Sequence, residues 1–231
     1  MINIRNLDCK VLMEEYISKG IKVDCIITDP PYEIEIGCRG INSKRNVMQL
    51  LGSMSKGVGE EYLDLMVKMQ EKINMYIFCS QTQMIKFIDY FTTKHKCMYT
   101  ILTWHKTNAI PAFNNKYLPD TEFILFVRGR GVKLNKGIYE MRRSYYLSSN
   151  NITDKKRYYH PTVKPLDLIT KFVINSTAEG DTIFDPFMGT GTTGVVAHKL
   201  VRNFIGCEID TNFFTTAKRR FWEESCEVSL S

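Results

Sequence analysis

The sequence lacks long apolar runs, a signal pattern and any recognisable metal motif. None of its apolar stretches reaches the roughly 18 residues that a membrane-spanning helix needs, and the N-terminus has no basic and apolar leader. We therefore expect a cytoplasmic protein with no membrane partner. Its seven cysteines form no C-x-x-C pair, and no histidine stands at metal spacing from them. The sequence thus indicates neither a disulfide framework nor a metal site.

The stretch from Val23 to Tyr32, V-D-C-I-I-T-D-P-P-Y, joins a buried strand to a polar end. Its apolar run is typical of a strand that is covered on both faces. The two prolines have fixed φ angles and favour extended backbone before them, so Asp29 and Pro30 should form a stiff spur. The Asp29 carboxylate and the Pro30 carbonyl would then accept the two hydrogens of an exocyclic amine, with Tyr32 stacked on its ring. Taken alone, the same tetrapeptide also suits a plain turn.

A second motif runs from Thr182 to Gly194, T-I-F-D-P-F-M-G-T-G-T-T-G. Its three glycines match G-x-G-x-x-G between a predicted strand and an apolar helix. Such glycines let the backbone approach a ligand and leave helix N-terminal N–H groups facing it. A further strand, Phe204 to Cys207, ends in Glu208, where an acid is placed to bind ribose hydroxyls. By itself this half suggests a nicotinamide-dependent oxidoreductase.

The chain is too short after this second motif for a dinucleotide-binding fold. Only 23 residues follow Glu208, whereas that fold needs several more βα units. The missing strands must come from the N-terminal side, where helices and strands alternate over residues 60–127. We predict an α/β fold, a doubly wound and mostly parallel sheet with helices on both faces, in permuted order. Both motifs should meet at one crevice of a single domain, 1–231.

Four motifs in this order make the chain resemble the β-class amino-methyltransferases of DNA. They are D-P-P-Y at 29, H-P-T-V-K-P at 160, F-D-P-F-M-G-T-G-T-T at 184 and G-C-E at 206, and they span nearly the whole chain. The resemblance implies a Rossmann-like methyltransferase fold and site-specific transfer of a methyl group from S-adenosylmethionine to the exocyclic amine of adenine in DNA. The transfer would proceed by direct attack after base flipping.

The same resemblance implies the site residues and leaves one alternative substrate. In this family Asp rather than Ser before P-P-Y favours adenine, and the exocyclic amine of cytosine is the alternative. No Pro-Cys pair occurs, which excludes covalent thiolate chemistry at a ring carbon of cytosine. The implied catalytic residues are Asp29, Pro30, Pro31 and Tyr32. The implied cofactor-binding residues are Asp8, Cys9, Asp29, Thr162, Lys164, Asp185, Phe187, Gly189, Thr190, Gly191, Thr192 and Glu208. Asp8 also suits a helix cap.

Basic residues concentrate between Arg128 and Tyr159. This segment holds nine basic and two acidic residues, a net charge of +7 in a chain of +6, and five tyrosines interleave with them. The mixture suits phosphate neutralisation and base contact, and the family keeps its target-recognition segment here, after the last sheet strand. A solvated surface is the plainer interpretation. The candidate DNA-binding residues are Arg142, Arg143, Lys155, Lys156 and Arg157.

The expected partner is double-stranded DNA, and the predicted chemistry requires no metal. A glycine-rich stretch at about 33–59, directly after the spur, predicts a flexible loop over the active site. The basic segment at about 128–159 is predicted to be a target-recognition insert. The sequence leaves open the recognition site, a homodimer and a restriction endonuclease partner.

Overall fold

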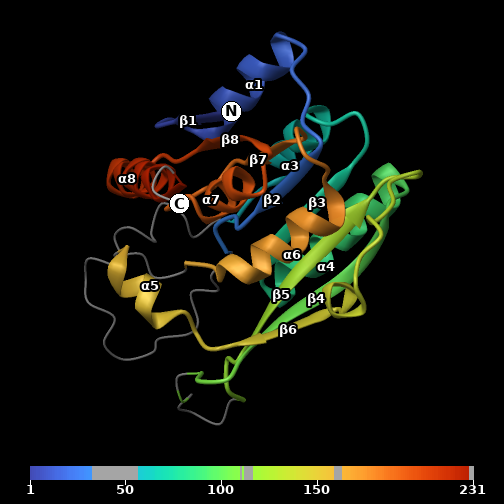
Figure 1. Cartoon of the computed structure of the whole chain (residues 1–231). Coiled ribbons are helices and arrows are strands. Elements are labelled where there is room, and N and C mark those ends of the chain that lie inside the picture. The colour runs from blue at the N-terminus through green and yellow to red at the C-terminus, as the bar shows by residue number, and fades with distance from the viewer. Residues whose placement is uncertain (33–56, 110, 112–116, 159–162, 229–231) are drawn as a thin grey trace.

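The structure, a computed structural model, describes residues 1–32, 57–109, 111, 117–158 and 163–228, without the side chains of 154, 156 and 224–228. One eight-stranded sheet crosses the molecule between two groups of helices (Figure 1). The strands are β1 (Ile2–Arg5), β2 (Cys25–Thr28), β3 (Asn74–Cys79), β4 (Met98–Lys106), β5 (Thr121–Arg128), β6 (Tyr145–Ser148), β7 (Thr182–Asp185) and β8 (Asn203–Cys207). The α-helices are α1 (Cys9–Ser18), α3 (Glu60–Lys68), α4 (Gln81–Asp89), α5 (Ile152–Arg157), α6 (Leu166–Ser176), α7 (Thr192–Lys199) and α8 (Thr211–Val228).

The strand order β1-β8-β7-β2-β3-β5-β4-β6 brings the two sequence motifs together. β2 and β7 lie far apart in the chain, yet they pair side by side in parallel. The spur that begins at Asp29 and the glycine loop after Asp185 therefore leave the same edge of the sheet. Among the described strands, β5 alone runs against its neighbours. Ligands bind at the carboxyl ends of parallel strands in such sheets. The predicted doubly wound sheet in permuted order is confirmed.

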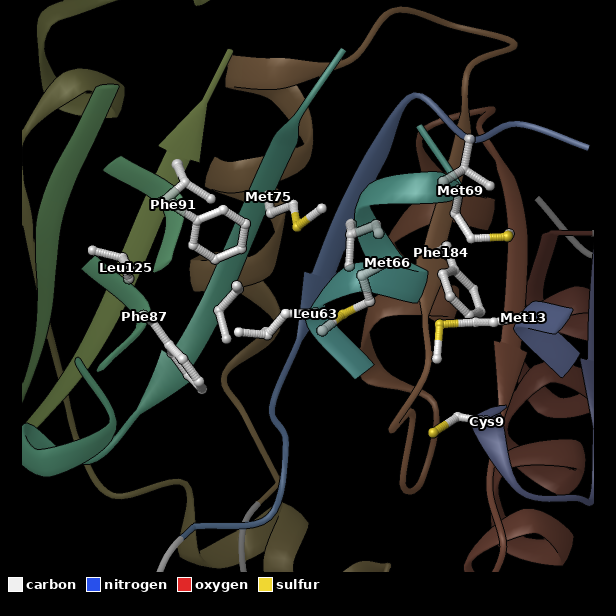
Figure 2. Packing of buried hydrophobic residues seen from close by; sticks show 14 of the residues in the cluster. Cys9, Met13, Leu63, Met66, Met69, Met75, Phe87, Phe91, Leu125 and Phe184 are labelled. Carbon is white, nitrogen blue, oxygen red and sulfur yellow. The ribbon is translucent and has the colours of Figure 1, made fainter. Parts of the chain in front are cut away.

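Each face of the sheet has its own apolar core, because side chains alternate along every strand. On one face, Ile26 of β2 and Met75 of β3 pack against α1, α3 and α4, and Figure 2 shows Met66 and Phe184 in this cluster. On the other face, Ile27 of β2 packs among residues of α6, α7 and α8. Burial on both faces explains why β2 is continuously apolar rather than alternating.

Local sequence signals set the starts of α1, α4 and α6. The Asp8 carboxylate accepts the backbone N–H of Lys10 at 2.7 Å, so the expected cap of α1 is confirmed. Ser80 and Gln83 form a reciprocal capping box at the start of α4. Pro165, whose fixed φ suits a helix start, stands immediately before α6. Within the described residues, no helix combines the length and apolar character that a bilayer crossing requires.

The basic segment at about 128–159 supplies part of the sheet. Its residues Tyr145–Ser148 form β6, which pairs in parallel with Thr103–Lys106 of β4. The expectation that this segment follows the last sheet strand of that half is therefore wrong. Y-Y-L-S is a short edge strand with two exposed side chains, so it shows no continuous apolar run. The predicted flexible loop lies mostly outside the described residues, which resume at Gly57.

The contact between α7 and α8 predicts a stability effect at Gly194. A Cβ there would lie 2.5 Å from Phe221 and 2.6 Å from Phe204. Gly194→Ala should therefore lower the free energy of unfolding by about 1 to 3 kcal/mol, since overlap outweighs the gain in helix propensity. Urea unfolding measures the change. The exposed Thr215→Ala on α8 is the control and should stay within about 0.5 kcal/mol. Equal stability of Gly194→Ala and the native chain would contradict this packing.

Candidate active site

A chain of alternating charges surrounds the spur after β2. Lys164 Nζ lies 2.7 Å from Asp29 Oδ2 and 3.1 Å from Glu122 Oε2. Lys106 Nζ lies 2.7 Å from the other oxygen of Glu122. Glu122 stands near the start of β5, and because β5 runs antiparallel, its first residues lie beside the carboxyl ends of its neighbours. Lys164 stands directly before Pro165 and α6, and its ammonium group lies between the carboxylates of Asp29 and Glu122.

Burial and pairing set the protonation of this group. Burial raises the pKa of Asp29, the Lys164 charge opposes this rise, and Glu122 adds to it. Burial disfavours the charge of Lys164, but Asp29 and Glu122 outweigh it and raise the pKa of the lysine. Burial likewise works against Glu122, yet Lys164 and Lys106 hold its pKa below the ordinary value. The lysines thus favour the charged form of both acids: they lower the pKa of Glu122, and Lys164 offsets part of the rise that burial causes in the pKa of Asp29.

The rest of the spur is fixed by α4 and leaves one acceptor open. Gln83 Nε2 donates to the carbonyl oxygen of Pro31 at 3.0 Å, and the same side chain takes part in the α4 capping box. Burial raises the pKa of Tyr32 well above its ordinary value, and the charge of Asp29 adds to the rise. Among the described residues, the buried Asp29 Oδ1 has no hydrogen-bond partner. The Tyr32 hydroxyl lies close enough to the carboxylate to oppose the rise of the Asp29 pKa. Asp29 therefore has one oxygen paired with Lys164 and a second that can accept a further donor.

The glycine loop after β7 is tied to two acids. Glu208 accepts the N–H of Gly189 at 3.0 Å and the N–H of Asp210 at 2.8 Å. Burial raises the pKa of Glu208. Asp185 accepts the hydroxyl of Thr193 at 2.8 Å and a backbone N–H at 3.2 Å, and its burial raises the pKa to about 7. Acid and backbone N–H groups thus stand at the ends of β7 and β8.

Asp8 and Cys9, which the resemblance implies to be cofactor-binding residues, lie near Glu208. Burial raises the pKa of the Cys9 thiol to about 12, and the nearby charges of Asp8 and Glu208 add to the rise. The rings of Phe187 and Tyr62 lie 6.5 Å apart. Burial raises the pKa of Tyr62, and the charge of Asp8 adds to the rise. An acid, two aromatic rings and the loop therefore border one region. Of the implied cofactor residues, Thr162 lies outside the described residues.

The glycines of the loop serve backbone geometry and helix packing. Gly189 has φ +52° and Gly191 has φ +80°, conformations that favour glycine. A Cβ on Gly191 would lie 2.9 Å from Phe221 of α8. Gly191 and Gly194 both leave room for the ring of Phe221 of α8. One side of the loop is therefore covered by side chains of the protein itself, among them Phe221 of α8. The approach of a ligand to these glycines stays a prediction.

Four side chains that the structure places at the site were not identified from the sequence. They are Glu122, Gln83, Tyr62 and Arg220. Arg220 is buried on α8, donates to the hydroxyl of Thr192 at 3.0 Å and lies over the ring of Tyr158 at 4.2 Å. Two signals were available: Glu122 is an acid at the head of the apolar strand T-E-F-I-L-F-V, and Arg220 falls on the inward face of α8, three residues after Ala217.

Arg142 and Arg143 lie away from the spur, along α6. Asn175, near the end of α6, donates to the carbonyl oxygen just before Arg142 at 2.7 Å. Lys164 lies just before the start of the same helix, whose 11 residues span roughly 16 Å. Arg143 Nε is 2.8 Å from Glu140, so its guanidinium already has an acidic partner. The structure does not group these two arginines with the spur.

The candidates on α5 stand closer to the spur. Burial lowers the pKa of Lys155, and the nearby cations Lys106 and Lys164 lower it further. Arg157 is exposed at the end of the same helix. The side chain of Lys156, between them, lies outside the described residues. Lys155 thus lies near the charges around the spur, whereas the Arg157 guanidinium lies 3.4 Å from Glu223 of α8. Arg142 and Arg143 lie in another place.

Comparison with known proteins places this architecture in a family. The family model N6_N4_Mtase, described as DNA methylase, matches residues 23–219. The chain is 27% identical over 253 residues to the Type II methyltransferase M2.MboI of Moraxella bovis, an alignment that covers 96% of this chain and 88% of that protein. The spur, the glycine loop and Glu208 all fall inside the matched region.

Solved structures agree with this assignment. The structure of M1.HpyAVI in complex with SAM is 30% identical to this chain and superposes with a TM-score of 0.71, covering 95% of this chain and 100% of that one. The cytosine-N4-specific PvuII DNA methyltransferase superposes with a TM-score of 0.68 over 95% of this chain and 86% of that one, at 14% identity, and so shares the fold. These matches are to DNA methyltransferases, so the alternative of a nicotinamide-dependent oxidoreductase is wrong. The chain belongs to the N6/N4 DNA methylase family, the β-class amino-methyltransferases that depend on S-adenosylmethionine.

Proposed function

We propose that this enzyme methylates the exocyclic amine of adenine at a specific site in double-stranded DNA. The observation that carries the proposal is the state of Asp29. Its Oδ2 is held by Lys164, while its buried Oδ1 has no hydrogen-bond partner among the described residues. A buried acceptor without a donor costs free energy, so the position suits a ligand that brings an N–H group. The exocyclic amine of a base is such a group.

The spur would act on the amine by accepting hydrogen bonds from its two N–H groups. The amine lone pair of adenine is delocalised into the ring, which makes the nitrogen a poor nucleophile. Acceptors at Asp29 Oδ1 and the Pro30 carbonyl favour the pyramidal nitrogen of the transition state over the flat ground state. Because the amine is paired inside duplex DNA, the base must leave the helix stack, and stacking on Tyr32 would contribute about 1 to 3 kcal/mol.

The residues at the ends of β7 and β8 fit S-adenosylmethionine. Acid oxygens on Glu208 match the hydroxyls of a ribose, and the rings of Phe187 and Tyr62 beside Asp8 match a flat adenine. When bound, the cofactor supplies a methyl group on a positively charged sulfur. The proteins of known structure include one with SAM bound, M1.HpyAVI. Asp185 and the loop from Gly189 to Thr192 would complete the site.

Adenine rather than cytosine is the finer part of the proposal. Its support is Asp29 in the position before P-P-Y, where the family resemblance associates an acid with adenine. The PvuII enzyme is cytosine-N4-specific, but its 14% identity bears on the fold alone. The two substrates yield different products, N6-methyladenine and N4-methylcytosine, which makes the choice directly measurable.

Asp29→Ala tests the chemistry. We expect methyl transfer to fall by roughly 10² to 10³, the scale for loss of one positioned polar group, while DNA affinity changes by only a few fold. The assay follows methyl transfer to duplex DNA and identifies the methylated nucleoside by mass spectrometry. Asp181→Ala is the matched control, because Asp181 stands just before the amino end of β7, away from the carboxyl ends of the strands. Retained activity in Asp29→Ala would remove this carboxylate from the mechanism, and N4-methylcytosine as the product would change the substrate.

Glu208→Ala tests the cofactor site. S-adenosylmethionine at about 100 times its dissociation constant should raise the free energy of unfolding of the native chain by about 2.7 kcal/mol. The variant should lose most of this increment at the same concentration. Because Glu208 also holds the N–H groups of Gly189 and Asp210, each protein is compared with and without ligand in urea unfolding. The exposed Glu179→Ala should keep the full increment, and stabilisation by NAD instead would contradict the assignment.

The two groups of basic residues predict different salt dependence of DNA binding. Each lost phosphate contact reduces the slope of log affinity against log salt by about 0.9. Replacing Lys155, Lys156 and Arg157 together with Ala should flatten the slope by up to about 2.7 units, because α5 lies beside the spur. Replacing Arg142 and Arg143 should change it by less than about 0.9. Fluorescence anisotropy of a labelled duplex measures both. The reverse order would place the DNA along α6.

A further inference from the structure

We propose that Lys164 and Glu122 are positioning residues that keep Asp29 ionised and aim its free oxygen at the target amine. This inference rests on the proposed role of Asp29. It gives Lys164 a function different from the one implied by the resemblance, in which it holds the cofactor. It also assigns a function to Glu122, which belongs to no recognised motif of the chain.

The geometry leaves Lys164 little freedom for another partner. Its side chain is 8% exposed and its Nζ lies between Asp29 Oδ2 and Glu122 Oε2, at 2.7 and 3.1 Å. The ring of Phe78 lies 4.7 Å from the same nitrogen. An ammonium group with two carboxylates and an aromatic face around it is held in one orientation. Its position in turn fixes the carboxylate plane of Asp29.

Glu122 holds Lys164 in place and is itself held by Lys106. Its Oε1 lies 2.7 Å from Lys106 Nζ, which also lies 5.1 Å from the ring of Trp104. Two acids and two lysines therefore alternate along one line from β4 to the spur. Removal of either end of such a line leaves a buried charge without its partner. Glu122 acts on the reaction only through Lys164, without touching the substrate.

Ionisation of Asp29 is what this line controls. A protonated carboxyl would lose the negative charge that favours the developing positive nitrogen, so the acid limb of the rate profile should follow Asp29. Lys164 is the cation nearest to it, while the anion Glu122 and the groups Asp185, Cys79 and Tyr32 also face it. Lys106 and Lys155 surround Glu122 and Lys164 from β4 and α5.

The sign of the effect differs for the two positions. The Lys164 charge opposes the rise of the Asp29 pKa that burial causes, so Lys164→Met should move that pKa further up. The Glu122 charge adds to the rise, so Glu122→Gln should move it down while Lys164 stays beside Asp29. A merely structural role would lower stability in both variants without opposite shifts.

The experiment is the pH dependence of the single-turnover methylation rate, from about pH 5 to pH 9, with saturating DNA and cofactor. Lys164→Met should raise the apparent pKa of the acid limb by about 1 to 3 units, and Glu122→Gln should lower it. Lys164→Arg, which keeps the charge, should restore much of the native profile. Lys171→Met is the matched control: Lys171 is a buried lysine of α6 that donates to the carbonyl oxygens of Arg143 and Tyr145. It should leave the acid limb in place.

Two further measurements decide between the explanations. The dissociation constant of S-adenosylmethionine should stay within about threefold in Lys164→Met, and urea unfolding identifies any variant that does not fold. An unshifted acid limb together with weakened cofactor binding would overturn the inference and return Lys164 to the cofactor. If Asp29→Ala keeps its activity, the proposed function of the spur fails. If Asp29→Ala is inactive and only the Lys164→Met profile is unshifted, the positioning role alone fails.

Discussion

The parallel pairing of β2 with β7 is the constraint on which the site depends. These strands are separated by most of the chain, yet the spur and the glycine loop follow their neighbouring carboxyl ends and so lie side by side. Neither motif contains a complete site. Asp29 and Pro30 have acceptors but no cofactor site, and the loop with Glu208 has backbone donors and acid oxygens but no group to act on an amine. Burial of β2 on both faces fixes the register that joins them.

Much of this arrangement could be predicted because its signals are local. The apolar run before Asp29, the G-x-G-x-x-G spacing and the start of α6 after Pro165 each follow from a few adjacent residues. The permuted order was predicted from a long-range feature, the order of the four motifs along the chain. β6 could not be predicted in the same way, because an edge strand with half its side chains exposed shows no apolar periodicity of its own.

The site was less predictable than the fold, since its electrostatics arise from residues that are distant in sequence. Glu122 and Lys164 belong to different elements, and no spacing rule links them to each other or to Asp29. The grouping of basic residues shows the same limit. Arg142 and Lys155 share one charge-rich segment, yet β6 and the length of α6 carry them to separate parts of the molecule. The net charge of a sequence segment therefore does not show which of its basic residues lie together in the folded protein.

The charged line at the spur has a physical cost that stability alone does not explain. Buried ion pairs often contribute no more to folding than apolar side chains of similar size, because desolvation offsets their attraction. Folding stability alone therefore does not account for Asp29, Lys164 and Glu122 at these positions. The proposed role of Asp29 would supply the missing reason. A desolvated carboxylate that keeps its charge would interact strongly with a developing positive charge, whereas burial by itself disfavours that charge. Lys164, paired with Glu122, opposes this effect of burial on the pKa of Asp29.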